Sequence, residues 1–334
     1  MSIDTDRFSA ALRERAIRVG RRDLRIARLE GSEQATDLTD PVNCGGFGRV
    51  RHFRRKTQVP WPENPLPIDP AAKALGLEPR DVLRAQVFQN AVCNWRCWYC
   101  YVDYPLLSGN DQNSEMLSVD QLLDLYEAEE DRASVIDLSG GQPDLVPEWV
   151  VWMIEELEHR GHSQKVYLWS DDNLSNSYFW EKLDNFQRKV LEEYKTYGKV
   201  CCFKGFDSRS FAFNTGAMPE MFDRQFDLMD KLVRETSLDL YSYATFTTPD
   251  ATGIEVEMSR FVDRLQEISP TFPLRLVPLR VEVFTPSSGR IGPEHAAALA
   301  VQDEAITAWS AELQSRFSKQ QLEASITEVE IRVS

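Results

Sequence analysis

The chain has 334 residues and a formal net charge of −15 at pH 7, with hydrophobic residues at 42% and aromatic residues at 10%. This composition excludes disordered, collagenous and low-complexity proteins, and the length suffices for a large core. No stretch approaches the roughly 18 consecutive apolar residues that span a bilayer. Six cysteines are too few to staple a fold with disulfides, which favours a reducing compartment. We therefore expect a globular protein of the cytoplasm without membrane contact.

The charge is divided unevenly along the chain. Residues 1–60 hold 13 Lys and Arg against 8 Asp and Glu, whereas the rest of the chain holds 25 against 45. Within the basic part, segment 45–56 (GGFGRVRHFRRK) interleaves glycines, aromatic residues and cations. Such a composition is able to cradle phosphate through backbone N–H groups and to stack a nucleotide, so nucleic acid is a candidate partner. The alternative, which we favour, is a charged face that docks on the acidic body.

The first 80 residues carry few regular signals. Residues 1–30 have the composition of a basic amphipathic helix, and 41–80, rich in Pro, Gly and polar residues, is expected to be irregular. From residue 82 onward, short β-branched or apolar runs alternate with segments of helical period, which predicts repeated βα units around a parallel sheet. The six predicted strands are 82–88, 134–139, 165–170, 200–206, 238–246 and 274–284. The predicted helices lie near 118–131, 146–160, 176–194, 218–235 and 257–268.

Local signals mark several boundaries. Ser118 followed by Gln121 is typical of a capping box, and Pro147 stands where the first turn of a helix tolerates proline. An Ala-rich helix is predicted over 294–316, and the alternation in 327–333 predicts a closing edge strand. The elements define an α/β fold in three parts, which are a basic extension over 1–81, a βα domain over 82–290 and a C-terminal extension over 291–334.

Three cysteines follow directly after the first predicted strand of the βα series. Residues 93–100 read CNWRCWYC, which places Cys93, Cys97 and Cys100 in a C-x3-C-x2-C spacing. A structural zinc ion needs a fourth ligand with its own spaced partner, and no histidine pair supplies one. A short loop with three thiolates suits an iron–sulfur cluster, because three cysteines on a 4Fe–4S cube leave one iron open to a small molecule. This donor set favours a catalytic cluster over a purely electron-carrying one.

The cysteine loop, with Tyr99 before its last cysteine, resembles the radical S-adenosylmethionine (radical SAM) superfamily. A second motif supports the resemblance, since residues 139–143, SGGQP, close the second predicted strand and are similar to the Gly-Gly-Glu-Pro motif of that family. The resemblance covers residues 84–285. It implies a partial (βα)6 TIM-like barrel of the radical SAM type, with the site at the carboxyl ends of the strands.

The resemblance also implies two cofactors. Cys93, Cys97 and Cys100 would hold a 4Fe–4S cluster, and its open iron would chelate the amino and carboxylate groups of S-adenosylmethionine. Tyr99 would lie against the adenine.

The glycine motif would bind the methionine end of the same molecule. Gly140 and Gly141 would let the backbone approach the methionine amino group closely, and Pro143 would fix the turn. Gln142 departs from the family, in which glutamate is commoner. A neutral amide still accepts a hydrogen bond, so the departure weakens one contact only.

Two further strand ends carry a fainter similarity. Ser170, Asp171 and Asp172 end the third strand, where family members place Thr-Asn-Gly, which implies contacts with the methionine or ribose hydroxyls. A solvated loop with helix-capping acids is the open alternative. Lys204 resembles the lysine in the Asp-x-Lys-x-x-Asp run of activating enzymes and would contact the ribose or the carboxylate.

The implied reaction is reductive cleavage of S-adenosylmethionine to methionine and a 5′-deoxyadenosyl radical, which abstracts hydrogen from a small-molecule or nucleotide-type substrate. The electron would come from a donor such as flavodoxin or ferredoxin. Nucleic acid, bound through 45–56, is open but not favoured. Lys204 and Asp207 also leave open an activating enzyme that installs a radical on a partner protein. The alternative of another class is a non-catalytic metal-binding module.

Because side chains alternate across a strand, only one of Cys201 and Cys202 is expected to face the interior.

Overall fold

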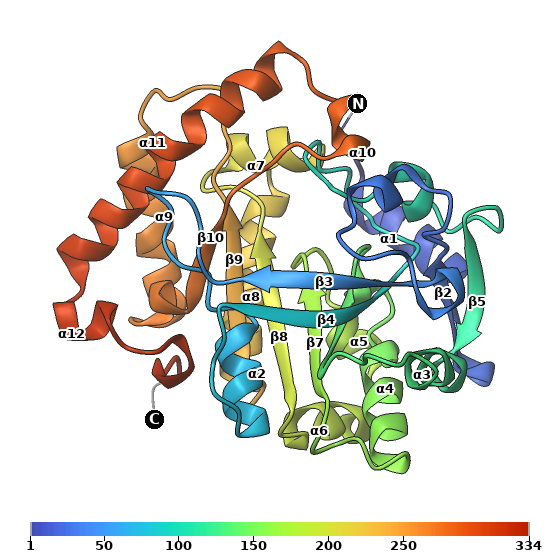
Figure 1. Cartoon of the computed structure of the whole chain (residues 1–334). Coiled ribbons are helices and arrows are strands. Elements are labelled where there is room, and N and C mark those ends of the chain that lie inside the picture. Colours follow the sequence, from blue (N-terminus) through green and yellow to red (C-terminus); the bar gives the residue numbers. More distant parts are fainter. Residues whose placement is uncertain (1, 333–334) are drawn as a thin grey trace.

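The structure is a computed structural model and describes residues 2–332. The strands of its main sheet are β3 (Gly48–Arg54), β4 (Val82–Gln89), β6 (Val135–Ser139), β7 (Tyr167–Asp172), β8 (Tyr197–Phe203), β9 (Leu240–Thr245) and β10 (Leu276–Leu279). They lie in the order β10-β9-β8-β7-β6-β4-β3, and the sheet curls into a half-barrel (Figure 1). The six strands from β4 to β10 are parallel and follow one another in chain order, whereas β3 pairs antiparallel with β4.

Helices connect the parallel strands and line the outer side of the sheet (Figure 1). A second, three-stranded antiparallel sheet has the order β1-β2-β5 and is formed by β1 (Ile17–Arg18), β2 (Asp23–Ala27) and β5 (Ser114–Ser118). The α-helices are α1 (Thr5–Ala16), α2 (Ile68–Leu75), α3 (Val119–Glu127), α4 (Glu148–His159), α5 (Tyr178–Lys182), α6 (Asn185–Glu193), α7 (Ser208–Thr215), α8 (Met221–Glu235), α9 (Ile254–Ile268), α10 (Thr285–Ser288), α11 (Pro293–Arg316) and α12 (Lys319–Leu322). Within residues 2–332 no helix is both long and apolar enough to cross a membrane.

All six predicted parallel strands are present, so the predicted α/β class is confirmed as a mixed α/β fold with a curled sheet. The largest difference concerns the last strand, which is predicted over 274–284 and ends at Leu279. Both the N–H and the C=O of Val281 bond to the side chain of Gln302 on α11, at 3.0 and 3.1 Å. Because these two backbone groups are already paired, the chain leaves the sheet there and runs on toward α10.

Side chains of the parallel strands divide between two cores. One core lies against the helices and includes Leu168, Cys201 and Phe203. The other fills the inner side of the half-barrel, and Trp169 and Cys202 belong to it. The expectation that only one of the two adjacent cysteines faces inward is therefore confirmed, because alternate residues of a strand point to opposite faces.

Capping signals fix two of the helices. Ser118 and Gln121 form the expected capping box at the start of α3. The single helix predicted over 176–194 is instead divided into α5 and α6, because Asp184 caps the second piece by accepting a hydrogen bond from the N–H of Gln187 at 2.8 Å. A residue that caps a new helix has an extended backbone and ends the preceding one.

The predicted helix over 1–30 is wrong beyond Ala16. Ile17 adopts an extended backbone and pairs with Leu24, so the chain turns into the small antiparallel sheet. Arg25, on β2, donates from its Nε to the carbonyl of Arg15 at 2.9 Å. This bond takes one of the carbonyls that the last turn of a helix leaves unpaired.

The expected irregular segment 41–80 contains two regular elements, β3 and α2. β3 runs alongside β4 for its whole length, from Gly48 opposite Phe88 to Arg54 opposite Val82. The strand therefore belongs to the main sheet.

The C-terminal helix is confirmed as α11, but the closing strand over 327–333 is wrong for its described part. Residues 326–328 form a 3-10 turn, and 329–332 lie outside any strand of the described chain; Val333 lies outside the described residues. Side chains take the carbonyls that a ladder would use. Arg275 donates to the carbonyl of Val329 at 2.8 Å, and Thr271 donates to that of Glu330.

Candidate functional site

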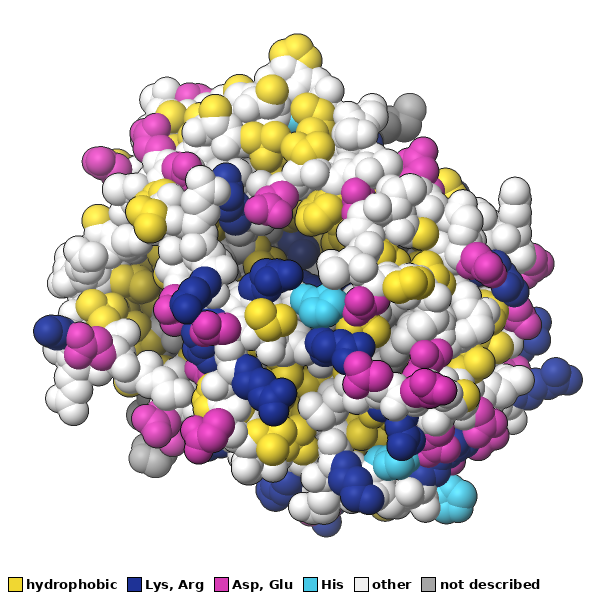
Figure 2. Space-filling view, viewed as in Figure 1, with side chains coloured by type: hydrophobic (Ala, Val, Ile, Leu, Met, Phe, Trp, Pro, Cys, Tyr) yellow, Lys and Arg dark blue, Asp and Glu magenta, His cyan; other side chains and the backbone are white. Residues whose placement is uncertain are grey.

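A cavity of about 450 Å³ opens at the carboxyl ends of the parallel strands. Figure 2 shows the same face hollowed above β3, with Lys and Arg side chains around the hollow. Most of the residues predicted from the sequence to form a site line this one cavity, although they come from four separate segments. These residues are Cys93, Cys97, Tyr99, Cys100, Gly140, Gly141, Gln142, Asp171, Asp172 and Lys204.

The cysteine loop begins just after β4 and is held by its own backbone. The N–H of Cys100 donates to the carbonyl of Cys97 at 3.0 Å, which closes a turn between the last two thiols. The N–H of Cys93 donates to the carbonyl of Leu107 at 3.3 Å. Tyr104 adds a hydroxyl 3.0 Å from the Cys97 carbonyl. These hydrogen bonds set the shape of the loop.

Side chains from distant parts of the chain anchor the same loop. Arg290, on the segment after α10, donates to the carbonyls of Cys100 and Val102 at 2.8 and 3.0 Å. Its guanidinium also lies over the ring of Tyr104, 3.5 Å from the centroid. On the other side, the Trp98 indole N–H donates to Asn214 at 3.1 Å. The segment after α10 and α7 therefore both fix the loop.

The three thiols are free and half-buried. Burial raises the pKa of Cys97 to about 12, and it also raises the pKa of Cys100. Thiolates bind metals, so metal binding at this loop must displace protons from thiols that hold them tightly. Within residues 2–332 no three Cys, His, Asp or Glu side chains converge as ligands of one metal ion. A cluster does not need such convergence, because each of its cysteines binds a different iron atom.

The glycine turn packs directly on the start of the cysteine loop. A Cβ on Gly140, whose φ is +90°, would lie 1.8 Å from Cγ of Gln89. A Cβ on Gly141 would lie 2.2 Å from the carbonyl oxygen of Val92. Close packing inside the protein therefore requires both glycines, in addition to the approach to a ligand that the sequence suggests. The N–H of Gln142 completes the junction by donating to the same carbonyl at 2.8 Å.

The side chain of Gln142 is fully occupied by neighbours in the protein. Its amide nitrogen donates to the Asp172 carboxylate at 2.9 Å, and its oxygen accepts from the N–H of Asn173 at 3.0 Å. Only 1% of the residue is exposed. Gln142 thus joins the end of β6 to the end of β7, and this is the position at which the sequence departs from the family motif.

A buried charged triad supports this junction. Lys199 on β8 donates to both oxygens of Asp144 at 2.7 Å and lies 3.3 Å from Asp172. One ammonium faces two carboxylates, so the site favours one proton on the pair of acids. Burial and the facing Asp172 raise the pKa of Asp144 to about 8. Burial opposes ionisation of Asp172 as well, but Lys199 holds the pKa of that carboxyl below its ordinary value.

Two predicted site residues lie outside the cavity lining of the described chain. The Ser170 hydroxyl is buried against the Tyr197 hydroxyl at 2.8 Å, on the side of β7 that faces the helices. Pro143 is buried at the start of a 3-10 turn. Pro147, predicted in the first turn of a helix, is the N-cap of α4.

Three of the predicted residues present polar groups to the cavity. The Tyr99 hydroxyl donates to Thr245 at 3.1 Å, and Asp171 accepts a hydrogen bond from Ser139. Lys204 lies beyond the end of β8. Burial favours its neutral amine, but the surrounding Cys202, Tyr99, Cys97 and Asp171 hold the pKa of Lys204 well above its ordinary value.

The sequence did not indicate that β3 lines the cavity. Arg49 and Arg51 both line it, together with His52. Arg49 donates to the Tyr101 hydroxyl at 2.8 Å, and Arg51 lies 3.5 Å from a carboxylate oxygen of Asp137. The only signal in the sequence was the alternation of arginines with apolar residues in segment 45–56.

The same segment does not cradle phosphate with its backbone. The N–H groups of Gly46 and Gly48 both donate to the carbonyl of Asn43, at 3.1 and 3.0 Å. Residues 48–54 form the edge strand β3, in which the backbone groups of alternate residues pair with β4 and the N–H groups do not converge on one point. The arginine side chains are therefore the part of this segment that is available to a ligand.

Two segments distant in sequence meet beside the cavity. Asp37 accepts hydrogen bonds from the backbone N–H and the hydroxyl of Thr285, at 2.7 and 2.8 Å. Asp37 lines the cavity, and so does Phe284, which packs edge-on against Tyr101. The N-terminal extension and the end of the βα domain thus join each other at the cavity wall.

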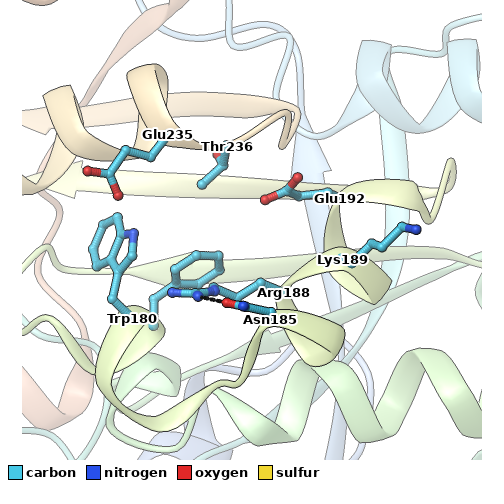
Figure 3. A pocket seen from close by; sticks show the side chains of 8 residues that line it. Trp180, Asn185, Arg188, Lys189, Glu192, Glu235 and Thr236 are labelled. Carbon is cyan, nitrogen blue, oxygen red and sulfur yellow. Dashed lines mark hydrogen bonds between the residues drawn. The ribbon is translucent and has the colours of Figure 1, made fainter.

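A second pocket, of about 290 Å³, lies between α5, α6 and the end of α8. Figure 3 shows its lining, with Trp180 facing Glu235 and with Arg188 bonded to Asn185. None of the predicted site residues, all of which the structure describes, belongs to it. The cysteine-lined cavity is therefore the candidate functional site.

No protein-family model and no curated protein matches the chain. Among solved structures, three crystal structures of SuiB from Streptococcus suis are similar to part of it, one bound to the precursor peptide SuiA, one bound to S-adenosylmethionine and one with neither named. Sequence identity is 16%, with TM-scores of 0.39, 0.39 and 0.38. The match covers 55% of this chain and 36 or 37% of SuiB, so the chain spans little more than a third of that protein's length. TM-scores of this size are too low to assign a function.

Proposed function

We propose that this chain is a radical SAM enzyme that acts on a small-molecule or nucleotide-type substrate. One observation carries the proposal. The thiols of a C-x3-C-x2-C loop and the backbone of a Gly-Gly turn line the same cavity at the carboxyl ends of parallel strands. In parallel α/β folds this end of the sheet is where ligands bind, because loops from several strands meet there. We further propose that the curled sheet is the partial (βα)6 barrel of that class.

The residues present fit the two cofactors that this function needs. Cys93, Cys97 and Cys100 would hold the 4Fe–4S cluster, because they are free thiols on one preformed loop that faces the cavity. Gly140 and Gly141 leave the wall beside them without side chains. When bound, the cluster and S-adenosylmethionine supply reductive cleavage to methionine and a 5′-deoxyadenosyl radical, which abstracts hydrogen from substrate.

The chain's own groups would bind and orient the cofactor. Lys204 carries a half-buried positive charge that suits a carboxylate, and Asp171 offers an acceptor for a hydroxyl. Tyr99 is fixed by its bond to Thr245 and presents an aromatic ring beside the last thiol. Ser170 would support the wall from behind through its bond to Tyr197, and Gln142 would hold the wall itself through its bond to Asp172.

The surroundings of the cavity would keep water from a reactive species. Trp98 is 5% exposed and packs edge-on against Tyr99, with ring centroids 5.4 Å apart. Phe284 and Tyr101 close another part of the wall. A cavity of about 450 Å³ has the size of an ordinary small-ligand pocket. We propose a small substrate, and a small protein such as flavodoxin or ferredoxin would supply the electron.

The proposal is tested by anaerobic reconstitution with iron and sulfide. We expect about four iron and four sulfide per chain, a brown colour with a visible band near 400 nm, roughly as iron–sulfur proteins show, and formation of 5′-deoxyadenosine from S-adenosylmethionine when dithionite is added. Cys93→Ala, Cys97→Ala and Cys100→Ala should each abolish this cleavage. Cys201→Ala is the matched control, because that thiol faces the helices and should leave the iron content unchanged.

Three results would overturn the proposal. A reconstituted protein that stays colourless, or that contains zinc alone, has no iron–sulfur cluster and is a metal-binding module at most. A protein that binds an iron–sulfur cluster but never forms 5′-deoxyadenosine transfers electrons at most and does not catalyse the proposed reaction. Cleavage that survives in all three loop variants would remove the assignment of the ligands.

A further inference from the structure

The antiparallel strand β3 brings the buried Arg49 and the half-buried Arg51 to the cavity. Arg49 is 5% exposed and lines the cavity, yet its Nε has no hydrogen-bond partner among the described residues. One terminal nitrogen of its guanidinium donates to the neutral Tyr101 hydroxyl at 2.8 Å. A buried guanidinium without an anion is costly, because the lost hydration of its charge is not replaced.

The nearest carboxylate is shared and weakly held. Arg51 approaches Asp137 at 3.5 Å, but neither oxygen of that carboxylate has a hydrogen-bond partner in the described chain. Burial and Asp171 raise the pKa of Asp137 to about 7, although Arg51 and Arg49 act in the opposite direction. Arg49 and Arg51 thus share one carboxylate that is only partly ionised at neutral pH, and Arg51 also faces Asp171. The excess of positive charge on β3 therefore lies at Arg49, whose guanidinium has no hydrogen-bonded carboxylate among the described residues.

The excess charge belongs to the same cavity as the thiols. Arg49 and Arg51 line it with Cys93, Cys97 and Cys100. A third cation, Arg280, lines it too, and its buried Nε likewise lacks a partner within residues 2–332. A guanidinium offers two parallel N–H groups that match the oxygens of a carboxylate or a phosphate. The unsatisfied donors therefore suit an anion that enters from the cavity.

We propose that Arg49 and Arg51 bind an anionic group of the substrate, a carboxylate or a phosphate, on the β3 wall of the cysteine-lined cavity. That the bound anion belongs to a substrate rests on the proposed function. The anion site itself does not depend on a cluster. It narrows the substrate class to molecules that carry such a group. It also assigns a role to part of the basic N-terminal segment, whose side chains face the cavity while its backbone is paired with β4.

One competing explanation is that these arginines bind the carboxylate of S-adenosylmethionine. Lys204 is already available for that group, since it lines the cavity and has Cys97 and Tyr99 for neighbours. Arg49 instead bonds to Tyr101. The experiment therefore measures the binding of S-adenosylmethionine in the same variants.

The test uses the full-length reconstituted chain and isothermal titration calorimetry with two probes, inorganic pyrophosphate and succinate. We expect one equivalent of at least one probe to bind, and Arg49→Met and Arg51→Met each to weaken that binding at least tenfold. Arg84→Met is the matched control, because Arg84 is on the neighbouring strand and pairs with the exposed Asp131, so binding should stay within twofold of wild type. If pyrophosphate binds more tightly than succinate, the anionic group of the substrate is a phosphate. If succinate binds more tightly, that group is a carboxylate.

Circular dichroism and the melting temperature show whether each variant folds. If one arginine variant does not fold, probe binding is compared in the other. The proposal is overturned if neither probe binds to the wild type, or if the folded arginine variants bind the probes as well as Arg84→Met does. It is also overturned if S-adenosylmethionine binding falls by the same factor as probe binding, which would assign the arginines to the cofactor. A wild type that binds the probes but forms no 5′-deoxyadenosine contradicts the proposed function and leaves the anion site standing.

Discussion

The side-chain amide of Gln142 donates a hydrogen bond to the Asp172 carboxylate at 2.9 Å, and this bond joins the glycine turn to the next strand end. A glutamate at position 142 would have no N–H to donate and would set two carboxylates against each other. The identity of this residue is therefore coupled to that of Asp172, and the amide suits this chain better than the acid.

We expect Gln142→Glu to lower the free energy of unfolding by about 2 kcal/mol at pH 8, because a buried donor is lost and a like charge is added. The loss should shrink at pH 5, where one carboxyl takes up a proton. Urea unfolding at both pH values measures it. Adding Asp172→Asn to Gln142→Glu restores a donor opposite the new acid and should recover at least half of the loss. A double variant less stable than Gln142→Glu alone would contradict this pairing.

The glycine turn predicts a steric effect. Gly140→Ala would place its Cβ 1.8 Å from Cγ of Gln89, at a φ of +90° that L side chains rarely adopt. We expect a loss of about 3 kcal/mol in unfolding free energy, from overpacking together with backbone strain. Gly20→Ala is the control, since nothing lies within 4 Å of a Cβ there. Equal effects of the two substitutions in thermal unfolding would show that the turn is not tightly packed.

The buried triad predicts a dependence of stability on pH. Because the pKa of Asp144 is raised to about 8 in the folded protein, the folded state holds a proton that the unfolded state has released above pH 4. The free energy of unfolding should therefore fall as pH rises from about 5 to 8, by up to about 1.4 kcal/mol per pH unit for this one proton. Asp144→Asn removes the titrating group and keeps an acceptor for Lys199. Its stability should change less over that range, and a slope as steep as that of the wild type would refute the assignment.

Arg290 predicts a coupling between the segment after α10 and the cysteine loop. Arg290→Met removes the donors to the carbonyls of Cys100 and Val102 and should lower unfolding stability by about 1–2 kcal/mol. If the loop holds a cluster as proposed, iron should also be lost to a chelator several times faster than in the wild type. Arg209→Met removes an exposed arginine paired with Asp250 and serves as the control. Identical rates of iron loss in the two variants would show that Arg290 does not hold the loop.

The sequence predicted the parallel strands because apolar, β-branched runs bounded by turns are a strong local signal. It also placed the cysteine loop and the glycine turn at strand ends, where the structure brings them to one cavity. These predictions needed only local patterns and the rule that carboxyl ends of parallel strands meet at one edge of the sheet.

The strand β3 was missed because its inward side chains include Arg49 and Arg51, so the apolar alternation that marks a strand is absent. Likewise, the bond from Gln142 to Asp172 depends on a register between β6 and β7 that no local pattern specifies. The closing strand over 327–333 failed for the opposite reason. Its alternation is typical of a strand, but side chains such as Arg275 take its carbonyls in the described part.

The bonds between Asp37 and Thr285 connect residues 248 positions apart in the chain. Synthesis proceeds from the N-terminus, and contacts between such distant residues are slow to form because a long loop must close first. A nascent polypeptide that has already emerged with all three cysteines still lacks this part of the cavity wall. The wall beside the thiols is therefore completed only after translation has passed Thr285.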